Sequence, residues 1–155
     1  IRVSQSKEFY LQPKKRSKEA VKVHGLVQER PYVSREKLIK NFLADAANKI
    51  IVGHHLGFDL AMLQKVGHTL GLNKIRQPGL DTYDLAVRME VGKIYNPYTI
   101  ASQDYSLDKL CERYGISLDD RHTAAGDALL TAQLLIKLLK LADKKGIKTY
   151  GELMS

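Results

Sequence analysis

The sequence predicts an α/β domain in which helices cover a mixed β-sheet. Short apolar strands alternate with longer amphipathic segments after a starting hairpin, which is the order typical of this fold class. A length of 155 residues indicates one domain over residues 1–155, and an apolar fraction of 44% is ordinary for a globular protein. The composition indicates neither a disordered chain nor a membrane protein, because the apolar runs are too short and too polar to span a bilayer.

The N-terminal part is expected to contain a hairpin, a basic connector and a helix. Ile1–Val3 and Glu8–Leu11 have strand character and are separated by a polar turn. The connector 14–18 is rich in lysine and arginine. We favour a solvated loop over a dedicated phosphate contact as the interpretation of this charge. Ser34 has the side chain of an N-cap for a helix running to about Lys49.

The middle of the chain predicts two further strand–helix pairs. Ile50–Val52 is a short run that is apolar on both sides, as in the central strand of a covered sheet. His54–Asp59 leads from this strand into a helix. Leu80–Thr82 is expected to form a second short strand, followed by a helix over about Tyr83–Val91. Asn96–Tyr98 is expected to be a loop.

The C-terminal part predicts two helices and a basic tail. Ser106 can cap a helix over Leu107–Tyr114, with Gly115 as its stop, and Ile116–Asp120 is then a loop. The stretch Arg121–Leu139 predicts a long helix with a largely apolar surface. The basic residues of the expected tail are Lys144, Lys145 and Lys148.

The start of this last helix combines a base and an acid. A helix starting at residue 123 or 124 places Asp127 in its first turn and Thr131 one turn further on the same face. His122 then lies on the loop that leads into the helix. A titratable base beside an acid at the mouth of a buried helix indicates chemistry more than packing.

Asp59 is a second candidate acid, since it follows the strand Ile50–Val52 at a junction where α/β sheets hold ligands. The helix dipole alone favours aspartate in a first turn, so the inference depends on Asp59, His122 and Asp127 converging on one cleft. Carboxylates suit Mg²⁺, and two such ions about 4 Å apart can clamp an in-line phosphoryl displacement. A histidine with an ordinary pKa of about 6.5 can then deprotonate the attacking water.

Charge and cysteine content narrow the partner and the compartment. Lysine and arginine number 25 against 17 acidic residues, a net charge of +8, which favours a polyanion, with nucleic acid first and an acidic membrane surface second. The single cysteine, Cys111, excludes an internal disulfide and a cysteine-based zinc site and suits a reducing cytoplasm. We interpret Cys111 as a small buried apolar residue on a helix.

The sequence GHHLGFDLAML resembles the second motif, H-N-x-x-F-D, of the DnaQ-like (DEDDh) 3′–5′ exonuclease family. RHTAAGDALLTA resembles the third motif, H-x-A-x-x-D-A, and SLDKLCERYGI and VHGL are similar to segments common in that family. The similarity runs from Ile1 to about Leu141. It implies an RNase H-like α/β/α fold and hydrolysis of terminal phosphodiesters with two Mg²⁺ or Mn²⁺ ions.

The resemblance also implies roles for individual residues. Asp127 matches the shared metal ligand, Asp59 matches the second-motif acid that serves the second metal, and His122 matches the general base. The residues that match positions near the terminal nucleotide are His24 and Phe58, with core packing as the alternative for Phe58. His55 stands where the family commonly has asparagine, which alters contacts to the substrate and removes no metal ligand.

The first family motif, D-x-E, is absent from the sequence. It would supply two of four carboxylates and the central strand, and Ile1–Val3 resembles the end of the second strand. We therefore expect roughly 25 to 40 further residues before Ile1 in the native polypeptide. Residues 1–155 alone are expected to be inactive.

Two classes of function follow. The first is a 3′–5′ exonuclease acting on single-stranded DNA, with a polymerase as a candidate partner and RNA as the runner-up substrate, because contacts to the 2′-OH decide between them. The second is a non-catalytic nucleic-acid-binding module of the same fold. His122 favours the enzyme, since a binding module has no need for a base beside the acid. Proofreading, repair and RNA trimming stay open as roles.

Overall fold

The computed structural model describes residues 5, 7–11, 32–72, 75–92, 96–119 and 121–154, with only the backbone at position 97. Helices dominate these residues, and the strands are short. In chain order the elements are β1 (Tyr10–Leu11), β2 (Tyr32–Val33), α2 (Arg35–Ala46), β3 (Ile51–Gly53), α3 (Leu56–Thr69), β4 (Gly79–Asp81), α4 (Thr82–Val91), the 3₁₀ turns η1 (Pro97–Thr99) and η2 (Ser102–Tyr105), α5 (Leu107–Arg113), α6 (Ala124–Lys144) and α7 (Tyr150–Met154).

The centre of the fold is the parallel pair of β3 and β4. Ile51 lies opposite Gly79, and Gly53 lies opposite Asp81. Parallel neighbours need a crossover connection, and α3 supplies it, so that β3, α3 and β4 form one β–α–β unit. Because the strands are parallel, their carboxyl ends lie at the same edge.

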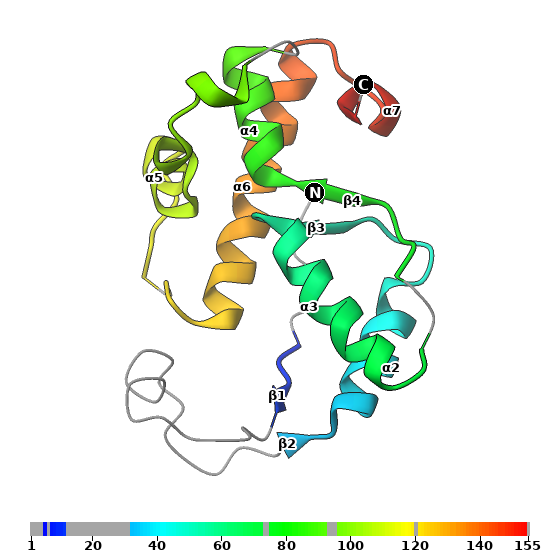
Figure 1. Ribbon diagram of the computed structural model, residues 1–155. Coiled ribbons are helices and arrows are strands. Elements are labelled where there is room, and N and C mark those ends of the chain that lie inside the picture. Colours follow the sequence, from blue (N-terminus) through cyan, green and yellow to red (C-terminus); the bar gives the residue numbers. More distant parts are fainter. Residues whose placement is uncertain are drawn as a thin grey trace.

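Helices cover this pair on two sides. Figure 1 shows α4 and α6 running alongside each other, with α5 next to α6, while α3 and α2 lie toward the other side of β3 and β4. Leu56 at the start of α3 lies against the strands, because a Cβ built on Gly53 or Gly79 would stand 2.8 or 2.9 Å from its methyl groups. Glycine at both positions therefore allows α3 to approach the strands closely.

The buried core lies on the side of α4, α5 and α6. Fully buried side chains from the three helices meet there, and Leu80 of β4 joins them. The residues with no measurable exposure in this cluster are Ala86 and Val87 of α4, Leu110 and Cys111 of α5, and Leu134 and Leu138 of α6. The interpretation of Cys111 as a buried helix residue is thus confirmed.

Three of the helix starts are fixed by side-chain caps, two of which, Ser34 and Ser106, are predicted from the sequence. The hydroxyls of Ser34, Ser106 and Thr123 accept hydrogen bonds from backbone N–H groups in the first turns of α2, α5 and α6. Gly115 follows α5 with φ of 64°, a backbone conformation that favours glycine. Local polar chemistry therefore sets these boundaries.

The N-terminal strands differ from expectation. Tyr10–Leu11 pairs in parallel with Tyr32–Val33, and Ile1–Val3, the other strand of the predicted hairpin, lies outside the described residues. Both strand pairs in the described part are parallel and each stands alone, so the mixed sheet stays a prediction.

The C-terminal end also contains α7, which follows the three lysines of the expected basic tail and was not predicted from the sequence. Arg88 of α4 donates to the backbone carbonyls of Leu153 and Glu152, and this anchors α7 on the core side. Tyr150 also donates to the carbonyl of Gly79 at 3.3 Å. No helix among the described residues has the length and apolar character needed to cross a membrane.

Candidate active site

Asp81 connects the carboxyl ends of β3 and β4. Its carboxylate accepts three backbone hydrogen bonds, from Tyr83 at 2.9 Å, from His55 at 3.0 Å and from Leu56 at 2.7 Å. The first bond caps α4, and the other two hold the turn that leads from β3 into α3. One carboxylate therefore fixes the start of both helices at the edge where the strands end.

His55 lies at the N-cap of α3 in the left-handed conformation, with φ of 57° and ψ of 44°. Its exposed ring lies 4.7 Å from the Tyr83 ring and 4.8 Å from the His54 ring, centre to centre. Histidine and asparagine are both enriched among non-glycine residues in this conformation. The asparagine that the family resemblance expects and the histidine found here therefore satisfy the same backbone requirement.

His54 is turned into the protein beneath this turn. Its Nδ1 lies 3.0 Å from the hydroxyl of Thr82, which itself donates to the carbonyl of Gly53. The one hydroxyl proton of Thr82 can serve only one of these two contacts; when it goes to Gly53, Nδ1 of His54 is the donor and Nε2 carries the lone pair. Nε2 is buried, and among the described residues it has no hydrogen-bond partner. Burial, helped by the neighbouring His55, lowers the pKa of His54 to about 4 and keeps the ring neutral near pH 7.

Phe58 and Asp59 occupy the first turn of α3 and reach solvent. The Phe58 side chain is 73% exposed, so core packing is wrong as the explanation for this residue. Partial burial of the Asp59 carboxyl, and then the negative charge of Asp81, raise the pKa of Asp59 above its ordinary value. A cation near Asp59 would offset the charge of Asp81 and so stabilise the ionised form of Asp59.

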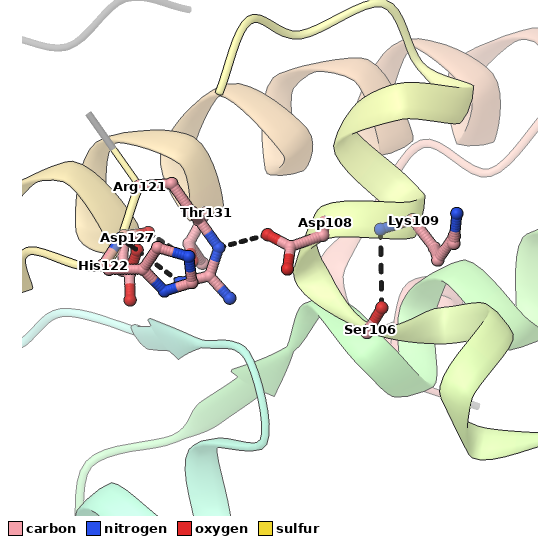
Figure 2. A network of polar contacts seen from close by, with 7 residues as sticks. All are labelled: Ser106, Asp108, Lys109, Arg121, His122, Asp127 and Thr131. Atoms are coloured by element: carbon pink, nitrogen blue, oxygen red, sulfur yellow. Dashed lines mark hydrogen bonds and ion pairs between the residues drawn. The ribbon is translucent and has the colours of Figure 1, made fainter. Parts of the chain in front are cut away.

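The predicted base and acid lie together at the start of α6 (Figure 2). The backbone N–H of His122 donates to Oδ1 of Asp127 at 3.1 Å, and the imidazole is exposed. His122 has a positive φ of 71°, which turns the chain sharply into the helix. Thr131 donates to the carbonyl of Asp127 at 2.8 Å, so the predicted one-turn spacing of these two residues is confirmed.

Arg121 joins this pair to α5. Its Nη1 lies 2.6 Å from Oδ1 of Asp127, and its Nε donates to Oδ1 of Asp108 in the first turn of α5. The Arg121 side chain is only 21% exposed, while the two aspartate side chains are about 40% exposed. The loop that carries His122 is therefore held between two helices.

The chemistry of Asp59 and Asp127 fits part of a magnesium site. Both offer carboxylate oxygens at helix starts, the hard donors that Mg²⁺ prefers, and both remain partly accessible. Within the described residues, however, no group of three or more histidine, cysteine, aspartate or glutamate side chains is placed to hold a metal ion. His24, the other predicted substrate contact, lies outside the described residues.

A cavity of about 690 Å³ lies away from these residues, between β3, β4 and the C-terminal part of α6. Its walls are mostly apolar and include Val52, Leu80, Leu135, Leu139 and Leu153. None of the predicted site residues that the structure describes lines it, so the chemistry is expected at the strand ends and not in this cavity.

Three contributors were missed by reasoning from the sequence alone: Asp81, His54 and Arg121. Asp81 carried a usable signal, because an aspartate between a strand and a helix is a common N-cap. The contacts of Arg121 with Asp108 and of His54 with Thr82 join residues distant in the chain, and no local pattern predicts them.

Comparison with known proteins gives a consistent picture. A family model described as an exonuclease matches residues 2–135. A PolC-type DNA polymerase III of Caldanaerobacter subterraneus subsp. tengcongensis is 29% identical over 131 residues, and that of Bacillus subtilis is 32% identical over 117 residues. The epsilon subunit of DNA polymerase III from Aquifex aeolicus is 32% identical over 119 residues.

The chain corresponds to a limited part of these relatives. The matches cover 84%, 75% and 76% of the chain, but only 8% of each PolC-type protein and 54% of the epsilon subunit. The match to the family model nevertheless spans more than half of the chain and includes His55, Asp59, His122 and Asp127.

Proposed function

The chain belongs to the exonuclease family, and on this premise we propose that it is part of a metal-dependent 3′–5′ exonuclease acting on single-stranded DNA ends. Its relatives carry the names of DNA polymerase III proteins, which favours DNA over RNA and a polymerase as partner. The net charge of +8 suits a polyanionic substrate. We include a proofreading role in this proposal.

The observation that carries the proposal is the placement of His122 beside Asp127. The N–H to Oδ1 hydrogen bond of 3.1 Å fixes the backbone of the histidine next to the acid, while the ring stays in solvent, where a substrate can reach it. In this role His122 accepts the proton of the attacking water. Asp127 and Asp59 would hold divalent ions, and these would stabilise the charge on the phosphate and favour ionisation of the water.

The turn between β3 and α3 provides the substrate contacts in this proposal. Phe58 projects into solvent at the same helix start as Asp59, and an exposed aromatic ring can stack on a terminal base. His55 presents a second exposed ring beside Tyr83. Asp81 acts in this proposal by positioning the turn.

A direct test uses the full-length protein with a 5′-labelled single strand and Mg²⁺ or Mn²⁺. Wild type is expected to give a ladder of shortened products, and Asp127→Asn is expected to lose at least about a hundredfold in rate. Asp143→Asn makes the same chemical change at the other end of α6 and should keep full activity. Equal activity of wild type and Asp127→Asn would defeat the proposal.

A second candidate is a non-catalytic nucleic-acid-binding module of the same family. It is favoured by one observation, that the described residues contain no three-member metal group. His122→Asn distinguishes the two candidates. It removes the imidazole, and the fold should be kept because asparagine tolerates the left-handed backbone. An enzyme loses about 10² to 10⁴ in rate while keeping its affinity for the strand. A binding module shows no metal-dependent cleavage in either form.

A further inference from the structure

Arg121 stands immediately before the base and contacts the acid directly. Its guanidinium spans Asp108 of α5 and Asp127 of α6, with Nη1 at 2.6 Å from Oδ1 of Asp127. Arginine is charged at every physiological pH and presents its donors in a rigid fork, so Arg121 brings a permanent positive charge to this position. The acid is therefore paired with a cation from the chain itself (Figure 2).

The two contacts of Arg121 use different nitrogens and different helices. Nε is bonded to Asp108, and Nη1 faces Asp127, so one contact can be released while the other is kept. Oδ1 of Asp127 also accepts the N–H of His122, which concentrates two donors on one oxygen. A divalent cation at Asp127 would therefore meet positive charge beside this carboxylate.

We propose that Arg121 competes with the divalent cation for the Asp127 carboxylate and that Asp108 holds the guanidinium when the cation binds. This rests on the proposed function, which places a metal at Asp127. Asp108 keeps the released charge on α5, and the loop carrying His122 stays attached to α5 throughout. Arg121 is thus a positioning residue that sets the metal affinity of the site.

The size of the effect follows from exposure. An ion pair to a carboxylate that is about 40% exposed is screened by water and is worth only a few-fold in an equilibrium constant. Removing Arg121 also removes a positive charge next to a dication. Together these effects predict a gain in metal affinity of about threefold to tenfold.

The test is a titration of the full-length protein with Mn²⁺, followed by the electron paramagnetic resonance signal of the free ion. Arg121→Gln is expected to bind Mn²⁺ about threefold to tenfold more tightly than wild type. Asp108→Asn is expected to bind about twofold more weakly, because the guanidinium then stays on Asp127. Arg113→Gln removes the same charge from a pair with Glu90 and should leave the affinity unchanged.

Opposite shifts in Arg121→Gln and Asp108→Asn support the competition. A structural role alone would loosen metal binding in both variants, and that result, or no tightening in Arg121→Gln, would overturn the inference. Asp127→Asn tests the metal role of Asp127 separately from the competition by Arg121. Loss of Mn²⁺ binding in this variant would support a metal at Asp127. Unchanged binding in that variant would overturn the proposed metal role and the competition together.

Discussion

Replacement of Asp81 by alanine removes the acceptor of three backbone N–H groups at once. The loss of the α4 cap costs about 1 kcal/mol. Removing the charged acceptor from the N–H groups of His55 and Leu56 costs about 1–3 kcal/mol more, and Leu56 is buried. Asp81→Ala is therefore expected to lower the free energy of unfolding by about 2–4 kcal/mol.

Urea denaturation followed by circular dichroism measures this difference. Ser34→Ala is the matched control, since it removes a side-chain cap with one hydrogen bond from α2 and should cost about 1 kcal/mol. Asp81→Asn should fall between the two, because its amide oxygen can keep the bonds to Oδ1 while the bond of Leu56 to Oδ2 is lost. If Asp81→Ala costs no more than Ser34→Ala, then Asp81 does not hold the turn between β3 and α3.

Three further predictions concern the same region. Burial of His54 lowers its pKa to about 4, so the unfolded chain binds more protons than the folded chain between pH 4 and 6.5. The free energy of unfolding should therefore rise with pH across that window, by at most about 3 kcal/mol. His54→Asn should flatten this pH dependence in urea titrations. Phe58→Ala should weaken single-strand binding about fivefold in fluorescence anisotropy and change the melting temperature little, since the ring is 73% exposed; unchanged affinity would exclude stacking. Gly53→Ala should cost about 1–3 kcal/mol in thermal melts, because its Cβ would meet Leu56 at 2.8 Å. Gly57→Ala should not destabilise, because no atom of the described residues lies within 4 Å of its Cβ, and equal effects of the two changes would contradict close packing of α3 on β3.

Elements whose signals are local could be predicted from the sequence. The hydroxyls of Ser34, Ser106 and Thr123 each bond to an N–H within three residues, so the helix starts can be found from adjacent residues. The alternation of β3, α3, β4 and α4 follows from the apolar pattern for the same reason.

Features that depend on distant pairing could not be predicted in this way. The pairing of Tyr10 with Tyr32 and the placement of α7 by Arg88 depend on contacts across many residues. The exposure of Phe58 was left open as well, because an aromatic residue in a first helical turn satisfies either packing or binding. Convergence of Asp59 and Asp127 on one metal site stays a prediction.

The left-handed backbone at His55 limits which sequences can serve in this position. A side chain here must tolerate φ of 57°, which disfavours valine, isoleucine and threonine and admits glycine, asparagine, aspartate and histidine. The first requirement on a side chain at position 55 is therefore that it tolerates this backbone conformation. A library randomised at this codon should return this small set among its folded members. Among them, His55→Asn should keep the fold while removing the imidazole ring, and so separate the role of the ring from that of the backbone.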